Sequence, residues 1–157
     1  MSVAGMRQEE GNYIMQTIKD VLRDKGQAVW SIDLNASVLD ALKLMAAKEI
    51  GALMVVDGGQ LVGVVSERDY ARKVVLHGKS SKDTPVREIM TQKVLYVRPE
   101  QTVEECMALM TDKHVRHMPV IDGERMIGVV SIGDIVKSVI SEQQFLISHL
   151  ENYIRGK

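Results

Sequence analysis

The strongest constraint on this chain is an internal repeat. Shifted by 65 residues, the sequence matches itself without a gap from position 30 to 70. The clearest stretch is VVDGGQLVGVVSERD at 55–69, which aligns with VIDGERMIGVVSIGD at 120–134. Upstream, TIKDVL at 17–22 matches PVREIM at 85–90 once a further shift of three residues is allowed. Two copies of one supersecondary unit therefore follow each other along the chain.

The first half of each copy predicts a short helix, a short strand and a longer helix. Thr17 begins the leading helix of copy one, and Thr84-Pro85 begins that of copy two, where proline suits the first helical position. Short strands are expected at 29–32 and 95–97. The longer helices begin after the capping patterns Ser37-x-x-Asp40 and Thr102-x-x-Glu105, and apolar residues then recur at the spacing of one helical face.

The second half of each copy predicts a β-hairpin followed by a helix. Asp57-Gly58 and Asp122-Gly123 stand between β-branched runs, which is a strong hairpin signal. The last helix begins at a serine in each copy and ends near Gly78 in copy one. The resulting order β-α-β-β-α, with a short leading helix, predicts an α/β (α+β) fold.

This order and its motifs resemble the CBS motif. The similarity covers about 17–141, and it is carried by GVVSERD at 63–69, GVVSIGD at 128–134 and RHMPVIDG at 116–123. The flanks of the repeat also look like stand-alone CBS-pair proteins of bacteria and plant organelles. The resemblance implies two tandem CBS motifs packed with pseudo-two-fold symmetry in one Bateman module.

The repeat also sets the expected boundaries. We expect a flexible tail at 1–16, CBS motif 1 at 17–77, a linker at 78–84, CBS motif 2 at 85–141 and a helical extension at 142–157.

A serine and an aspartate three residues apart recur where each last helix begins. The pairs are Ser66 with Asp69 and Ser131 with Asp134. A helix N-terminus favours a phosphate, and a carboxylate there can accept both hydroxyls of a ribose. The resemblance implies that the matching Ser and Asp contact ribose and phosphate. The same spacing is also that of an ordinary helix cap, so both interpretations stay open.

A basic pair in copy two has no counterpart in copy one. Arg116 and His117 precede Met118 and Pro119, whereas copy one has Gly-Ala at 51–52. The resemblance implies that basic residues at this place bind phosphates, in a cleft between the copies. Met118 and Pro119 are candidates for an apolar wall beside an adenine. The alternative is a solvated rim.

The last helices add two further candidates for nucleotide binding. Arg68 lies in the first turn of the helix in copy one, and Ile132 begins the helix in copy two. For Arg72 and Lys73, further along the first of these helices, a solvated face is the better interpretation.

Other classes of site have weak support. His114 and His117 are three residues apart, but no further cluster completes a metal site, so no metal is predicted. Cys106 lies on an apolar helix face and is expected to be a buried small hydrophobe. The sequence has neither a Walker loop nor a catalytic set with supporting context, and we expect no enzyme.

Charge and hydropathy argue against nucleic-acid and membrane partners. Twenty basic residues stand against 21 acidic ones, and no apolar run approaches the roughly 20 residues of a membrane-spanning helix. A single cysteine fits a reducing compartment, so we expect a cytoplasmic location.

The favoured function is regulation by an adenine nucleotide, with AMP first and ADP, ATP or NAD as alternatives. The ligand would act by changing the binding of an effector protein or the self-association of the chain. Two rivals remain: a scaffold with degenerate sites, and an enzyme acting on a nucleotide.

A long apolar stripe on the last helix predicts a homodimer. We expect the part from Phe145 to Ile154 to pack either on 13–18 or on another subunit. The stripe consists of Val136, Val139, Ile140, Ile147, Leu150 and Ile154.

Overall fold

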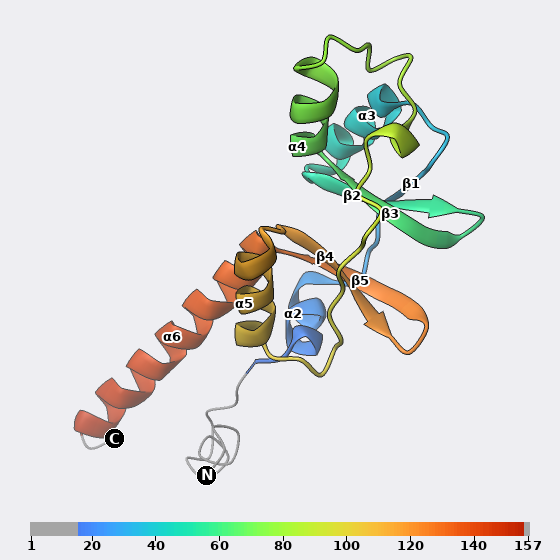
Figure 1. The fold of residues 1–157 in the computed structure, drawn as a ribbon. Coiled ribbons are helices and arrows are strands. Elements are labelled where there is room, and N and C mark those ends of the chain that lie inside the picture. The colour runs from blue at the N-terminus through green and yellow to red at the C-terminus, as the bar shows by residue number, and fades with distance from the viewer. Residues whose placement is uncertain (1–15, 156–157) are drawn as a thin grey trace. The chain divides into compact units, whose positions relative to one another are not determined.

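The computed structural model describes residues 16–155, and these form two compact units. Unit 1 combines 16–28 with 96–155, and unit 2 is the continuous segment Val29–Leu95 (Figure 1). The segment 13–18 is predicted to pack on the C-terminal part of the last helix, and its residues Tyr13, Ile14 and Met15 lie outside the described residues.

Unit 2 holds a three-stranded sheet in the order β1-β2-β3. Strand β1 runs parallel to β2, and β2 and β3 form an antiparallel hairpin. Helix α3 and the last helix of the copy pack on this sheet around an aliphatic core that includes Met45, Leu53 and Val74. The elements are β1 (Ser31–Asp33), α3 (Val38–Lys48), β2 (Ala52–Asp57), β3 (Gln60–Ser66), α4 (Glu67–Tyr70), the π-helix η1 (Ala71–Val75) and the 3-10 helix η2 (Val86–Glu88).

Unit 1 repeats this plan around the hairpin of β4 and β5. Where copy one has β1, the second copy has a single parallel bridge between Val97 and Val120, so the strand predicted at 95–97 does not form in full. Fully buried Val103, Cys106 and Ile135 belong to the core of this unit. The elements are α2 (Ile18–Lys25), α5 (Val103–Lys113), β4 (His117–Asp122), β5 (Arg125–Ser131) and α6 (Ile132–Ile154).

The leading segment of each copy packs in the unit formed mainly by the other copy. Helix α2 lies against β5 and α6 of unit 1, whereas Val86 and Ile89 are buried in the core of unit 2. The backbone bridges repeat this exchange, since Thr17 pairs with Thr102 and Ser37 pairs with Pro85. Each compact unit therefore needs residues from both copies.

A glycine in each hairpin makes room for the exchanged segment. A Cβ built on Gly128 would lie 2.7 Å from Leu22 Cδ2, and one on Gly63 would lie 2.8 Å from Met90 Sδ. Gly63 and Gly128 are equivalent in the repeat, and so are Leu22 and Met90. A larger residue at either glycine would push the leading segment off its sheet.

The predicted linker is an ordered part of unit 2. The side chain of Thr84 is buried and donates a hydrogen bond to the Ser80 carbonyl oxygen at 2.7 Å. The carbonyl oxygens of Ser81 and Thr84 accept from the Leu39 and Val38 N–H groups, at 3.0 and 2.8 Å. Residues 78–84 thus cover the N-terminus of α3, where N–H groups need partners.

Several local predictions need correction by one or two residues. The first hairpin turns at Gly58-Gly59, because Asp57 still pairs with Gln60, and both glycines have positive φ. The second hairpin likewise turns at Gly123-Glu124 rather than Asp122-Gly123, because Asp122 pairs with Arg125. Strand β1 begins two residues later than expected, and Pro85 is the N-cap of η2 rather than its first helical residue.

Of the predicted capping boxes, Ser37 and Thr102 form the N-cap half. The side chain of Ser37 accepts a hydrogen bond from the Asp40 N–H at 3.0 Å, and that of Thr102 accepts from the Glu105 N–H at 3.1 Å. The reciprocal side-chain bond is seen at Thr17, Ser66 and Ser131 among the described residues.

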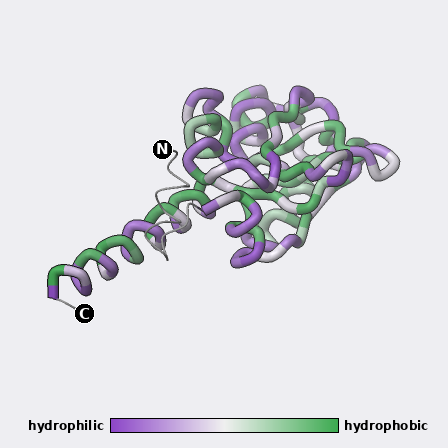
Figure 2. Tube along the Cα trace, turned by 90° about the horizontal axis from the view of Figure 1, so that it is seen from below, coloured by the Kyte–Doolittle hydropathy of each residue, from purple (hydrophilic) through white to green (hydrophobic). Residues whose placement is uncertain are grey.

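The buried face of helix α6 includes two polar residues beyond Ile135, and an apolar face is exposed. Ser138 and Glu142 are buried, and Ser138 is hydrogen-bonded to Gln16. The apolar stripe faces solvent, with Ile147 56% exposed and Leu150 50% exposed. The C-terminal half of α6 projects beyond α5 and α2 of its own unit (Figures 1 and 2). In this half, Ile147, Leu150 and Ile154 are not covered by the described part of unit 1.

Candidate ligand sites at the strand-to-helix junctions

Each last helix begins with a complete capping box built from the repeated serine and aspartate. In unit 1, Asp134 Oδ2 accepts from the Ser131 N–H at 2.8 Å, and Ser131 Oγ accepts from the Asp134 N–H at 3.2 Å. In unit 2, Asp69 Oδ2 accepts from the N–H and the Oγ of Ser66 at 2.9 and 3.0 Å. The capping interpretation of these residues is confirmed. Contact with a ligand stays a prediction.

Fewer backbone donors are free at these junctions than a bare helix N-terminus would offer. The Ile132 N–H donates to the Arg116 carbonyl oxygen at 2.8 Å, and the Glu67 N–H donates to the Gly51 carbonyl oxygen at 3.0 Å. The third N–H of each helix serves the cap. The second N–H of each helix, from Arg68 or Gly133, has no hydrogen-bond partner among the described residues and can bind an anion.

A lysine reaches the aspartate of each box, and sequence reasoning missed both of these ion pairs. Lys25, the last residue of α2, places Nζ 2.6 Å from Asp134 Oδ2. Lys73 places Nζ 3.1 Å from Asp69 Oδ1; its side chain is 44% exposed, as the predicted solvated face requires, and it forms this ion pair as well. The i, i+4 spacing could have indicated the second pair. No sequence signal links Lys25 to Asp134, because they lie far apart in the chain.

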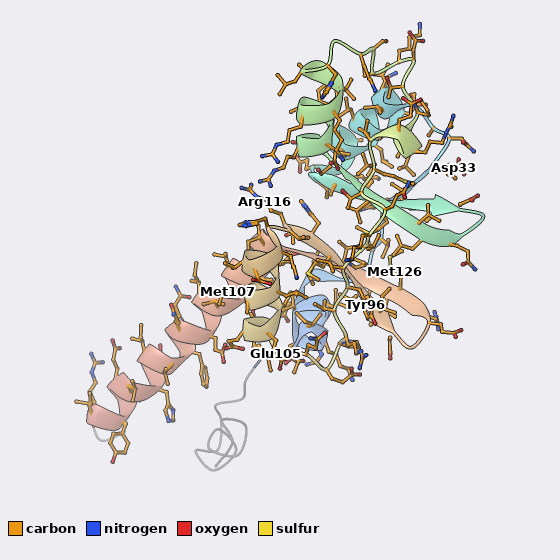
Figure 3. All side chains as sticks on the ribbon, in the orientation of Figure 1. Asp33, Tyr96, Glu105, Met107, Arg116 and Met126 are labelled. Atoms are coloured by element: carbon orange, nitrogen blue, oxygen red, sulfur yellow. The ribbon has the colours of Figure 1, made fainter. Side chains whose placement is uncertain are left out.

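The basic pair of copy two lies at the same junction of unit 1. His117 begins β4 and pairs across the hairpin with Ser131. Arg116 precedes it and is exposed (Figure 3). Burial, together with the charges of Lys25 and Arg116, lowers the pKa of His117, and the nearby Asp134 opposes this only in part. His117 is thus held neutral at physiological pH and offers an uncharged donor.

The charge of the Asp134 carboxyl is stabilised by its partners. Burial by itself raises the pKa of Asp134, but the hydrogen bonds from Lys25 and from the Ser131 N–H outweigh it and leave that pKa below its ordinary value. The junction therefore presents one carboxylate beside Lys25, Arg116 and His117. A group with hydroxyls next to a phosphate complements this arrangement.

The remaining predicted site residues are less accessible to a ligand or lie on a solvated face. Met118 is 0% exposed and Pro119 is also buried, so the burial lends no support to an apolar wall for an adenine. Arg68 and Ile132 are half-buried at the start of their helices. Arg72 is exposed, as the solvated-face interpretation predicts.

Three further properties of the described part of the chain concern a reactive thiol, a metal site and a membrane-spanning helix. Cys106 is fully buried, as predicted, and burial raises the pKa of its thiol to about 11. Among residues 16–155, no group of three His, Cys, Asp or Glu side chains gathers to hold a metal ion. The helices described here include none that is long and apolar enough to span a membrane.

Comparison with known families decides the identity of the repeat. The sequence model of the CBS domain matches residues 17–76 and 86–141. The chain belongs to the CBS-domain family. Within this family, the CBS pair is 42% identical over 160 residues to the mitochondrial CBS domain-containing protein CBSX3 of Arabidopsis thaliana, covering 96% of this chain and 77% of that protein.

Solved structures of other CBS proteins share the fold. A candidate signal-transduction protein with CBS domains from Burkholderia ambifaria is 56% identical, with a TM-score of 0.79, covering 82% of this chain and 96% of the other. The CBS domain pair of protein MJ0100, solved with 5′-methylthioadenosine and S-adenosyl-L-methionine, is 25% identical. It has a TM-score of 0.72 and covers 82% of this chain and 98% of that chain. The family and the α+β fold predicted from the repeat are confirmed.

Proposed function

We propose that this CBS pair is a regulatory sensor of an adenine nucleotide, with AMP the first candidate and ADP, ATP or NAD as alternatives. The observation that carries the proposal is the junction of unit 1. There a carboxylate with one free oxygen lies beside a lysine, an arginine and a neutral histidine. A CBS pair of the same fold binds two adenosine-containing ligands, which supports the adenosine part of the proposal.

The proposed ligand contacts follow from the chemistry of these groups. Asp134 would accept hydroxyls of the ribose, and Arg116 and His117 would donate to a phosphate. The free Gly133 N–H adds a donor at the positive end of α6. In unit 2 the equivalent contacts would come from Ser66, Arg68 and Asp69, where Arg68 is the candidate phosphate ligand.

The decisive experiment is calorimetric titration of AMP into the wild-type protein and into Asp134→Asn. The substitution should weaken binding about 10-fold or more, since a charge-assisted hydrogen bond contributes about 1.5–3 kcal/mol. Asp20→Asn is the matched control, because Asp20 completes the same capping box on α2 away from the junction. Unchanged affinity in Asp134→Asn would refute the ribose contact, and failure of every adenine nucleotide to bind would favour the scaffold alternative.

We propose a non-catalytic role for the pair. In this role the ligand changes assembly or the binding of an effector protein, and no bond is broken. Incubation with each candidate nucleotide, followed by chromatography of the nucleotide, tests this directly: any turnover would favour an enzyme acting on a nucleotide. A cytoplasmic location also stays a prediction, since the relative CBSX3 is named as mitochondrial.

We further propose that two copies associate through the exposed stripe of α6. Ile140, Ile147 and Ile154 are seven residues apart, and Leu150 falls between the last two at the spacing of a heptad. Isoleucine at the first and leucine at the fourth position of a heptad favours a two-stranded coiled coil. The exposed charged residues Lys137, Glu151 and Arg155 are of mixed sign, so no block of like charge opposes pairing.

Light scattering of Ile147→Asp and Ser148→Asp tests whether a second copy of the chain covers the stripe. Both residues are exposed, and each substitution adds the same charge to neighbouring positions of α6. Ile147→Asp should shift the protein to monomer, whereas Ser148→Asp should not. A wild-type protein that is monomeric at high micromolar concentration would refute the homodimer and would favour a cover from within the same chain.

A further inference from the structure

Lys25 connects the leading helix of the chain to the candidate site of unit 1. Its Nζ lies 2.6 Å from Asp134 Oδ2 and also donates to the Val129 carbonyl oxygen at 2.6 Å. Helix α2 packs on β5 and α6, so the ammonium is delivered to the junction by an element that sequence reasoning assigned to the first copy. The side chain of Asp134 is 23% exposed, so the pair is only partly screened by solvent.

The two oxygens of Asp134 are in different states. Oδ2 accepts from the Ser131 N–H and from Lys25, which uses both of its lone pairs. Oδ1 has no hydrogen-bond partner among the described residues. A single hydroxyl can therefore bind at Oδ1 with nothing displaced. A vicinal diol that contacts both oxygens requires Lys25 to leave Oδ2.

The equivalent aspartate in the other copy is also paired with a lysine, which supports a role for the lysine at Asp134. In unit 2, Lys73 bonds to Asp69 from four residues further along the same helix and also donates to the Ile89 carbonyl oxygen at 2.9 Å. The position of copy two equivalent to Lys73 is occupied by Ser138. Unit 1 thus lacks the local lysine and receives Lys25 from α2 in its place.

We propose that Lys25 sets the ligand specificity of unit 1 by exchanging Asp134 for the phosphate of a bound nucleotide. This inference rests on the proposed function and names a residue outside the Ser131–Asp134 capping box and the basic pair Arg116 and His117. A ribose diol takes the lysine-bound oxygen, and the displaced ammonium then needs another anion. A nucleoside 5′-phosphate carries that anion and a nucleoside does not, so displacement of Lys25 costs more for adenosine than for AMP.

The test compares AMP and adenosine in calorimetric titrations of the wild-type protein and of Lys25→Met. Removal of the competing ammonium should strengthen adenosine binding several-fold and should strengthen AMP binding less or weaken it. The ratio of the AMP affinity to the adenosine affinity should fall about 10-fold, the effect of losing one charge-assisted contact. Lys19→Met is the matched control, since Lys19 is exposed on the same helix, and it should leave the ratio unchanged.

The outcomes separate this inference from the function on which it rests. If AMP binds and Lys25→Met leaves the ratio unchanged, or weakens both ligands equally, Lys25 is only a structural tie and the inference is overturned. If neither ligand binds the wild-type protein, the proposed function fails together with the inference. Lys25→Gln, which keeps a donor and removes the charge, should also lower the ratio and guards against loss of folding in Lys25→Met.

Discussion

Replacing Gly128 with alanine tests whether the exchanged leading helix is held by close packing. The added Cβ would lie 2.7 Å from Leu22 Cδ2, which is closer than real Cβ contacts come, and 3.0 Å from Leu22 Cδ1, which is a tight contact. Leu22 is 1% exposed, so its side chain has little room to rotate away. Overpacking of this kind costs about 1–3 kcal/mol.

An opposing effect acts through the unfolded chain. Gly128 is not among the glycines with positive φ, so alanine can adopt its backbone conformation, and the loss of unfolded-state freedom stabilises by about 0.4–1 kcal/mol. The two ranges leave a net loss of up to about 2.6 kcal/mol, with a midpoint of about 1.3 kcal/mol. For a chain of this size the midpoint lowers Tm by about 3–5 °C.

Two further alanine substitutions give an expected ranking of the loss in stability. Gly63→Ala should cost more than Gly128→Ala, because its Cβ would lie 2.9 Å from the backbone oxygen of Thr91, which is held by hydrogen bonds to Val64. Gly133→Ala should be neutral or stabilising, since its Cβ meets only Ser131 Oγ at 3.6 Å. Thermal unfolding followed by circular dichroism measures all three. Equal Tm values for Gly63→Ala, Gly128→Ala and Gly133→Ala would refute the close approach.

Three further results follow from the junction and the core. The lowered pKa of His117 means that the unfolded chain binds a proton there at higher pH than the folded chain does. The free energy of unfolding should therefore fall as the pH drops through about 6.5, the ordinary pKa of histidine. Urea titrations at several pH values should show a smaller fall in His117→Gln. Arg116→Ala should weaken AMP binding several-fold and adenosine binding little, and equal losses in calorimetry would argue against a phosphate contact. Cys106 should react with a thiol reagent only after unfolding, because it is buried and its thiol pKa is about 11; a fast reaction in the native protein would contradict this.

The elements of this fold were predictable because their signals are local. Ser131 and Asp134 specify a capping box within four residues. Asp122-Gly123 correctly indicates a hairpin, but its turn lies one residue later, at Gly123-Glu124, because Asp122 pairs with Arg125. The same locality explains the errors of register. The pair Gly58-Gly59 offers two adjacent residues that tolerate positive φ, and the turn uses both in place of Asp57.

What the sequence could not predict depends on packing between distant segments. Periodicity identifies the apolar stripe of α6 but does not say which side of the helix faces its unit, and the structure turns Ser138 inward. The ion pair of Lys25 with Asp134 depends on α2 packing beside β5 rather than beside β3. Local patterns carry no information about that choice.

The exchange of leading segments has a consequence for synthesis of the chain on the ribosome. Unit 2 is continuous, so all its parts have been synthesised once Leu95 has been added. Helix α2 emerges first of the described helices, but the strand that buries Leu22 follows about a hundred residues later. During that interval its apolar face has no native partner, and chains released between the two copies would expose it. A nascent chain arrested before β5 should therefore bind chaperones through residues 18–22, and the full-length chain released from the ribosome should not.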